Sequence, residues 1–204
     1  MNYLAHAFLS WNLPLIQTGN LMGDFVKGKQ HNQYPELIEK GILLHRTIDH
    51  FTDTHSIVQQ AAMAFKSKYR FSGPVFLDIL FDHFLANDER YFTPDQLRAF
   101  CIDVYSNLQH SNTYFTDPMK ELFFYMKQYD WLYNYRSREG LTRSVNGICK
   151  RYPILGESTH ALELIERHFD EFRALYSDFF PELHAHVEEL KWQWLPNHTF
   201  ESSD

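Results

Sequence analysis

The chain has 204 residues, is 44% hydrophobic and 17% aromatic, and carries a formal net charge of −7. A chain of this length predicts one domain with a substantial core, because it buries roughly 70% of its unfolded surface. The acidic balance argues against a general nucleic-acid binder, which is usually basic. Its two cysteines, Cys101 and Cys149, do not make a disulfide scaffold and fit a reducing cytoplasm.

The first twenty residues are apolar, but they lack the basic start and the small-residue cleavage site of a signal peptide. No run approaches the roughly 20 apolar residues that a membrane-spanning helix needs. We therefore expect a soluble, cytoplasmic protein with no membrane partner. Residues 1–194 are expected to form one helical domain, and residues 195–204 a polar C-terminal tail.

Apolar residues recur at helical spacing along most of the chain, which predicts an all-α fold built as a single-domain helical bundle. The predicted helices cover 2–11, 35–51, 55–69, 74–86, 94–110, 117–129, 139–150, 158–178 and 181–194. Pro181 is expected to break the long C-terminal stretch in two. The segment GNLMGDFVKGK, residues 19–29, is left out of the helices because its glycines permit tight turns and close approach to a ligand.

Two of the predicted helices carry ionisable groups among apolar neighbours. His45 and Asp49 are four residues apart and share one helix face, and Asp78 and Asp82 repeat this spacing, with His83 next in the chain. Carboxylates are almost never fully buried unless they are paired or bound to a metal. Like charges at this spacing also repel unless a proton or a cation lies between them. The pattern therefore favours a bound cation.

Two further residues are candidate ligands of that cation: His6 in the N-terminal helix and Asp24 in the glycine-rich segment. Imidazole nitrogen and carboxylate oxygen without thiolate suit Mn²⁺, Mg²⁺, Fe²⁺ or Zn²⁺. Such a donor set is typical of an open, catalytic site. Each residue also has a structural alternative: His6 as a hydrogen-bonded core histidine, Asp78 as a partner of Arg46, and His83 as the group that orients Asp82.

Five segments in this order resemble the acyl carrier protein phosphodiesterases, which are related to the metal-dependent HD-domain phosphohydrolases. They read MNYLAHAFL, GNLMGDFVKG, GILLHRTIDHFTD, LDILFDHFLA and SVNGICKRYPIL. The resemblance covers residues 1 to about 190 and implies an HD-like helical domain. One departure is the doublet Asp82-His83, which reverses the usual order of the HD motif and leaves open which of the two binds metal.

The resemblance also implies a reaction. The family removes 4′-phosphopantetheine from a serine of holo-acyl carrier protein, which gives the apo carrier and free 4′-phosphopantetheine, and it favours manganese. The resemblance therefore implies a role in fatty acid biosynthesis and lipid metabolism. Carried over by position, the metal ligands are expected among His6, Asp24, His45, Asp49, Asp78, Asp82 and His83.

The expected roles follow from hydrolysis of a phosphodiester. Arg46 would neutralise charge on the phosphoryl oxygens, and Asp49 or Asp78 would position or deprotonate the attacking water. Asn146 and Arg151 would hold the substrate, with a helix-end role as the alternative for both.

An acidic carrier requires a local basic surface on this acidic chain. The densest basic stretch contains Arg136, Arg138, Arg143 and Lys150-Arg151, and Lys66, Lys68 and Arg70 form a second one. Two other functions stay open from the sequence: a phosphohydrolase acting on a nucleotide or another small phosphodiester, and a non-enzymatic helical module whose buried polar groups only specify the fold. The oligomeric state is not predicted.

Overall fold

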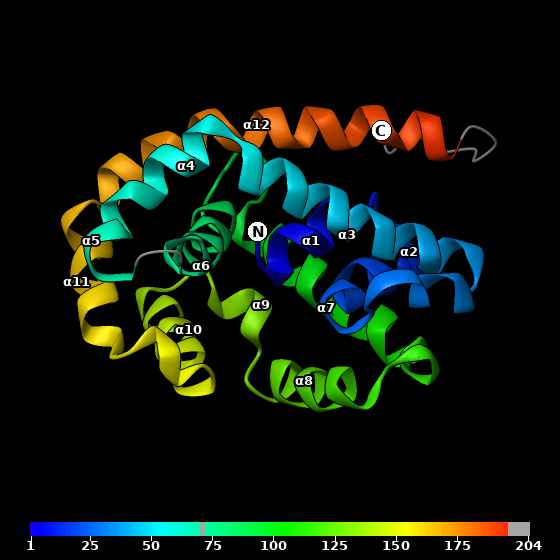
Figure 1. Cartoon of the computed structure of the whole chain (residues 1–204). Coiled ribbons are helices and arrows are strands. Elements are labelled where there is room, and N and C mark those ends of the chain that lie inside the picture. The colour runs from blue at the N-terminus through cyan, green and yellow to red at the C-terminus, as the bar shows by residue number, and fades with distance from the viewer. Residues whose placement is uncertain (70–71, 196–204) are drawn as a thin grey trace.

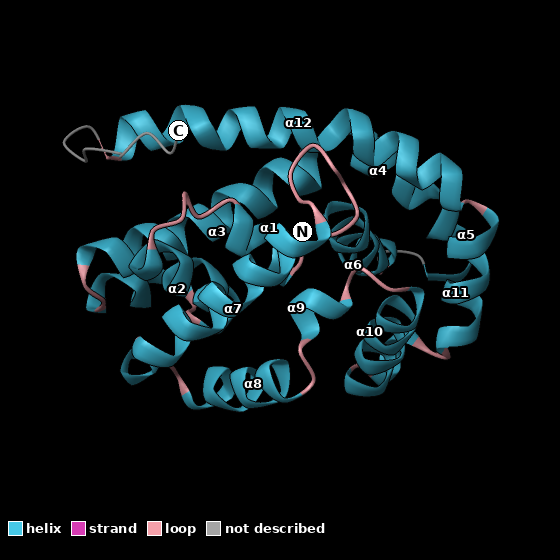
Figure 2. Ribbon diagram, turned by 180° about the vertical axis from the view of Figure 1, so that it is seen from behind, coloured by secondary structure: helices cyan, strands magenta, loops and turns pink. Residues whose placement is uncertain are grey.

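The computed structural model describes residues 1–69 and 72–195, and across these residues the secondary structure is helical with no strand (Figures 1 and 2). The predicted all-α class is confirmed. No helix within this described part is both long and apolar enough to cross a membrane. The predicted C-terminal tail, apart from Leu195, lies outside the described residues.

Twelve α-helices and five short 3₁₀ helices follow one another in the described part of the chain. The α-helices are α1 Tyr3–Phe8, α2 Pro14–Met22, α3 Glu36–Thr54, α4 Ser56–Ala62, α5 Lys66–Tyr69, α6 Gly73–Leu85, α7 Pro94–His110, α8 Asp117–Gln128, α9 Trp131–Asn134, α10 Arg138–Arg151, α11 Ser158–Arg167 and α12 Phe169–Trp194. The 3₁₀ helices are η1 Gly23–Phe25, η2 Gly28–Gln33, η3 Met63–Phe65, η4 Asn112–Tyr114 and η5 Pro153–Leu155.

Helix α6 occupies the centre of the molecule, with α12 running along one side over α3 and α4 (Figures 1 and 2). Every residue of α6 from Ile79 to Leu85 is buried, as predicted from its nearly continuous apolar sequence. Helix α1 packs against both α2 and α6. The N-terminus thereby lies between the two helices that carry the predicted ionisable groups, α3 and α6.

The glycine-rich segment was only partly predicted. Its first four residues, Gly19–Met22, continue α2, a helix that the sequence did not reveal. Gly19 faces α3, where an added Cβ would collide with the carbonyl oxygen of Ile38 and lie 3.0 Å from the Cα of Gly41. The two helices cross at backbone contact, so these glycines serve close packing as well as turns.

The predicted break at Pro181 is wrong. Helix α12 runs through the proline, and the chain bends earlier, at His168 between α11 and α12. A proline inside a helix frees the carbonyl four residues before it. Here that carbonyl belongs to Ser177, and the guanidinium Nη1 of Arg90 donates to it at 3.4 Å. Buried Phe179, Phe180 and Leu183 hold the helix on both sides of the proline.

The single helix predicted over 55–69 is divided into α4, η3 and α5, and the short helix α9 was not predicted. The helix predicted over 94–110 has the bounds of α7, with Thr93 capping it: its hydroxyl accepts from the Gln96 amide while the Gln96 side chain accepts from the Thr93 amide.

Candidate metal centre and adjoining cleft

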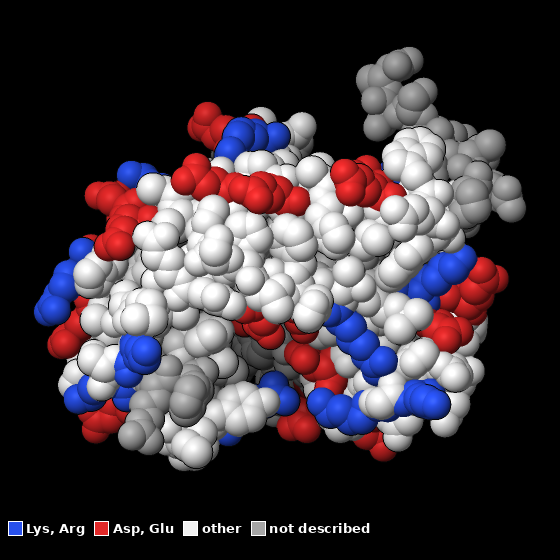
Figure 3. Space-filling view, turned by 45° about the horizontal axis from the view of Figure 1, so that its top comes forward, with Lys and Arg blue, Asp and Glu red and all other residues white. Residues whose placement is uncertain are grey.

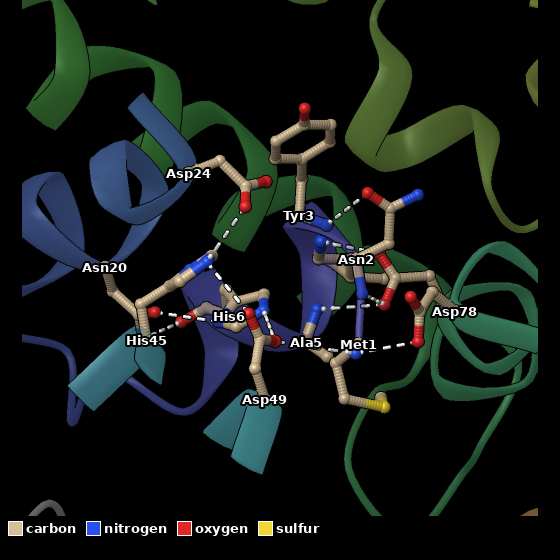
Figure 4. Close-up of polar contacts among 12 residues, drawn as sticks. Met1, Asn2, Tyr3, Ala5, His6, Asn20, Asp24, His45, Asp49 and Asp78 are labelled. Atoms are coloured by element: carbon tan, nitrogen blue, oxygen red, sulfur yellow. Dashed lines mark hydrogen bonds and ion pairs between the residues drawn. The ribbon is translucent and has the colours of Figure 1, made fainter. Parts of the chain in front are cut away.

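Three side chains from two helices converge on one point beneath the N-terminus (Figure 4). His6 comes from α1, and His45 and Asp49 come from α3, with one potential ligand atom of each within 4.8 Å of the others. Asp49 Oδ1 lies 3.2 Å from His6 Nε2, and Asp49 Oδ2 lies 3.0 Å from His45 Nε2. The two imidazole rings stack with their centroids 4.2 Å apart. The carboxylate therefore joins both rings.

Buried Asn20 of α2 fixes the orientation of His6. The amide nitrogen of Asn20 donates to the carbonyl of His6 at 2.8 Å and to Ser10 Oγ at 3.0 Å. Its oxygen consequently faces His6 Nδ1, at 2.8 Å. The neutral ring thus carries its proton on Nδ1 and turns the lone pair of Nε2 toward Asp49. Metal-bound histidines commonly donate their second ring nitrogen in this way.

His45 is buried, yet neither of its ring nitrogens has a hydrogen-bond partner within residues 1–69 and 72–195. Its Nε2 lies 3.0 Å from Asp49 and 3.4 Å from Asp24 Oδ1. These oxygens therefore lie off the axis of the N–H bond or lone pair of this nitrogen, although they are close to it. Two ligands of one ion, each bonded at about 2.1 Å, lie about 3.0–3.4 Å apart with the same oblique arrangement. The donor geometry thus fits a small divalent cation.

The glycine-rich segment gives access to this ring. An added Cβ at Gly23, in η1, would collide with the His45 ring, so a larger residue would push the imidazole away. The next residue, Asp24, is 65% exposed in its side chain and reaches back to His45. Asp24 thus lies beside His45 on the solvent side of the cluster, and its role as a ligand stays a prediction.

The carboxylates of the cluster shift the ionisation of its histidines. Burial lowers the pKa of His45, but Asp24 and Asp49 outweigh this effect and raise it to about 9. Burial raises the pKa of Asp49, whereas His45 and His6 hold it well below its ordinary value. The pKa of His6 is lowered by burial and by His45. A site that attracts a proton this strongly also attracts a cation.

Asp78 of α6 lies at the edge of the cluster. Its Oδ1 accepts from the α-ammonium group of Met1 at 2.8 Å, and the same ammonium lies 3.9 Å from Asp49 Oδ1. Burial lowers the pKa of this ammonium, but Asp78 and Asp49 raise it to about 10. The resemblance placed Asp78 among the candidate ligands, but the ion pair of Asp78 with the α-ammonium group was not predicted, because a terminal amine follows no residue pattern.

The structure does not bring Asp82 and His83 to the cluster. Asp82 is fully buried beneath α1, where its carboxylate accepts from the backbone amides of Asn2, Leu4 and Ala5 at 3.3, 2.7 and 3.2 Å. His83 turns away, and its Nδ1 lies 2.6 Å from the carbonyl oxygen of Tyr135. Backbone groups thus satisfy both side chains.

The other predicted residues are also placed. Arg46 Nη2 donates to the carbonyls of Val26 at 2.9 Å and Gly28 at 2.8 Å, so it ties down the segment after Asp24. Asn146 is exposed and lines neither the pocket at the cluster nor the large cleft beside it. Arg151 lines a large cleft beside the cluster.

This cleft has a volume of about 790 Å³ and lies between the N-terminus, α6, α9 and α10. It shares five lining residues with the smaller pocket at the cluster: Met1, Asn2, Tyr3, Asp24 and Asp78. The two hollows therefore adjoin. Arg143 and Arg151 line the part of the cleft formed by α10. Figure 3 shows acidic side chains along one side of a hollow and basic side chains near its other rim.

The fold and site define an all-helical protein with a candidate His-His-Asp metal centre. Residues 1–183 match the family model described as acyl carrier protein phosphodiesterase, and the chain belongs to this family. Relatives named acyl carrier protein phosphodiesterase occur in Photorhabdus laumondii, with 33% identity over 96% of this chain and 100% of the relative, and in Pectobacterium atrosepticum, with 30% identity over 90% and 95%. A third, from Yersinia pestis, is 31% identical over 90% of this chain and 95% of its own length. No solved structure matches the chain.

Proposed function

We propose that this protein is a metal-dependent phosphodiesterase that removes 4′-phosphopantetheine from holo-acyl carrier protein. The observation that carries the proposal is the buried Nε2 of His45, which has no aligned hydrogen-bond partner in the described residues and lies beside two carboxylates in a pocket that adjoins a large cleft. Family membership supports the carrier as substrate. Buried, reduced Cys101 and Cys149 support a cytoplasmic location.

His6, His45 and Asp49 would hold the divalent cation, which we propose to be Mn²⁺, with Asp24 on the solvent side. Imidazole and carboxylate donors suit this ion, and Mg²⁺, Fe²⁺ or Zn²⁺ are the alternatives. When bound, the cation supplies Lewis acidity toward a phosphoryl oxygen and lowers the pKa of water toward ~7. Asp82 and His83 are left out of this ligand set because the backbone already satisfies them.

The chain's own residues would then position the reactants. Asp49 lies between both histidines and acts as a ligand, so Asp78, which lines both hollows, is the better candidate to accept the proton of the attacking water. Arg46 acts indirectly, by fixing the segment that carries Asp24. On this proposal the phosphoryl charge is met by Arg151, not by Arg46.

The carrier would dock against α10. This helix carries Arg143, Lys150 and Arg151 on exposed positions, and none of the three has an ion pair within the described residues. Arg136 belongs to a different pocket, which it lines together with His83, and its guanidinium lies 4.5 Å from the Tyr133 ring centroid. The predicted patch is accordingly redrawn around α10, where positive charge borders the cleft and attracts an acidic partner.

The decisive experiment is incubation of the purified protein with holo-acyl carrier protein and Mn²⁺, followed by mass spectrometry of the carrier. Loss of the prosthetic group, dependent on metal and abolished by a chelator, is expected. An unchanged carrier together with turnover of nucleotides or other small diesters would contradict the proposal and favour a general phosphohydrolase.

The docking surface is tested by the double variant Arg143→Glu/Lys150→Glu. Its KM for holo-carrier should rise and lose most of its salt dependence, because charges at an interface rim act mainly on association. The matched control Lys120→Glu/Lys127→Glu makes the same change of charge on α8, away from the cleft lining. Equal KM values for the two double variants would exclude α10 as the docking surface.

A further inference from the structure

One glycine of α10 has no structural explanation. Gly147 lies inside this helix, where glycine is less favourable than alanine because it orders a more flexible backbone. Close packing does not require it, since a Cβ added at Gly147 would meet nothing within 4 Å. Gly140 on the same helix is different: there a Cβ would collide with the carbonyl oxygen of Asn134. Only Gly140 is needed for the fold.

Gly147 instead faces the large cleft. It lines the cleft together with Ser144, three residues earlier, and Arg151, four residues later. These spacings place the three on one helix face. Ser144 has no hydrogen-bond partner in the described part of the chain. The face of α10 that borders the cleft therefore has no side chain at Gly147. The hydroxyl of Ser144 lies at one end of this face and the guanidinium of Arg151 at the other.

The cleft also has the size and the connection that a long substrate arm needs. Its volume of about 790 Å³ lies in the range of sites that enclose a small organic ligand, roughly 300–1,000 Å³. Tyr3 and Asp24 belong to the wall shared with the metal centre. Burial raises the pKa of the Tyr3 hydroxyl and Arg151 opposes this, so the guanidinium acts close to the junction of the two hollows.

We propose that this cleft binds the pantetheine arm of the substrate and that Gly147 provides the clearance for it. The inference rests on the proposed function, because it takes the scissile diester to lie at the metal centre. The methyl and methylene groups of the arm would lie against Val75, Ile79 and Ile148, which line the cleft. The amides would meet Ser144 Oγ, and the phosphate would lie between Arg151 and the cation.

The test is a size series at one position: Gly147→Ala, Gly147→Leu and Gly147→Phe, with Thr142→Phe as the matched control. Thr142 is exposed on the same helix and does not line the cleft. Because Gly147 has free space around it, the variants should fold, and Gly147→Ala should melt at a higher temperature than the natural protein. Ser144→Leu provides a second way to fill the cleft.

We expect the KM for holo-carrier to rise with side-chain size, by about 10-fold or more for Gly147→Phe, since overfilling a site costs about that much in binding. Metal-dependent turnover of bis(p-nitrophenyl) phosphate, a small diester without the arm, should stay within about 2-fold, as should both activities of Thr142→Phe. Direct binding of pantetheine, followed by calorimetry, should weaken in the same order as the KM rises.

The two proposals fail in different ways. If the natural protein leaves holo-carrier intact, the proposed function is wrong. Pantetheine binding by the natural protein and by the Gly147 variants then still tests whether the cleft binds the arm. If holo-carrier is cleaved but Gly147→Phe and Ser144→Leu keep the natural KM and the natural affinity for pantetheine, the arm lies elsewhere and the inference is overturned.

Discussion

Helices α3 and α6 present the same pattern in sequence and opposite situations in space. Each carries a carboxylate and a histidine among apolar residues. In α6, Asp82 is met by three backbone amides of α1 and His83 by the Tyr135 carbonyl. In α3, buried His45 has only carboxylates placed beside its bonding direction. A buried ionisable group needs a hydrogen-bond or charge partner. In α6 the backbone of the fold supplies this partner, whereas in α3 the position remains available to a ligand.

The largest effect is expected at Asp49. The variant Asp49→Ala should lose the metal and more than about 100-fold of its activity, because losing even an outer partner of a metal ligand costs roughly 10–100-fold. Its thermal stability should also fall, because the variant loses the contacts of this carboxylate with His6 and His45 and the stabilisation that a bound ion supplies. Elemental analysis of the purified protein and carrier turnover measure this. Natural metal content with natural turnover would remove Asp49 from the centre.

Asp82 should show the reverse behaviour toward the metal. In Asp82→Ala three amides at the start of α1 lose their acceptor, two of them in fully buried bonds. An unsatisfied buried donor costs about 1–3 kcal/mol, so the free energy of unfolding should fall by about 3 kcal/mol or more in urea titration. The fraction of Asp82→Ala that stays folded should bind as much metal as the natural protein. Loss of metal without loss of stability would return Asp82 to the ligand set.

The pH dependence of stability sharpens the same prediction. Burial raises the pKa of Asp82 to about 7, although the amides of Leu4 and Ala5 oppose this. The unfolded value is about 3.9, so between these values the folded state binds more protons than the unfolded state. This contribution therefore favours folding at low pH and is lost as the pH rises through 7. The free energy of unfolding of Asp82→Asn should therefore lack this component, and it should fall less than that of the natural protein as the pH rises from about 4 to about 7.

Asn20 tests whether the orientation of His6 matters. Replacement by alanine removes the acceptor of His6 Nδ1, and metal affinity should fall by about 10–100-fold. Ser10→Ala is the matched control, because Ser10 contacts the same carbonyl and the same amide without touching the imidazole. Metal titration of both variants separates the two. Equal loss of affinity would mean that the effect arises from local packing.

The smallest effect is expected at His83. The variant His83→Ala should lose about 1 kcal/mol of stability with the bond to Tyr135, and little or no activity. Chemical denaturation and carrier turnover provide the two readings. A loss of activity comparable with that of Asp49→Ala would mean that the two helices do not differ in the way described.

The sequence by itself determined the helical class, the positions of most helices and the set of ionisable residues from which the candidate site is drawn. These properties are local, since helical periodicity and caps depend on neighbours within a few turns. Even there, α2 was missed because Gly19 within it and Gly23 at its end were read as turn residues. Pro181 was misread because the contact of Arg90 with Ser177 spans 87 residues.

Only the tertiary structure decided which ionisable residues share a site. The crossing of α1, α2 and α3 brings His6, Asn20 and His45 together, and the approach of α1 to α6 directs Asp82 to backbone amides. Such contacts depend on how helices pack at a distance, where side-chain spacing within one helix carries no information. For this reason the residue pattern was the same in α3 and α6, whereas their chemistry differs.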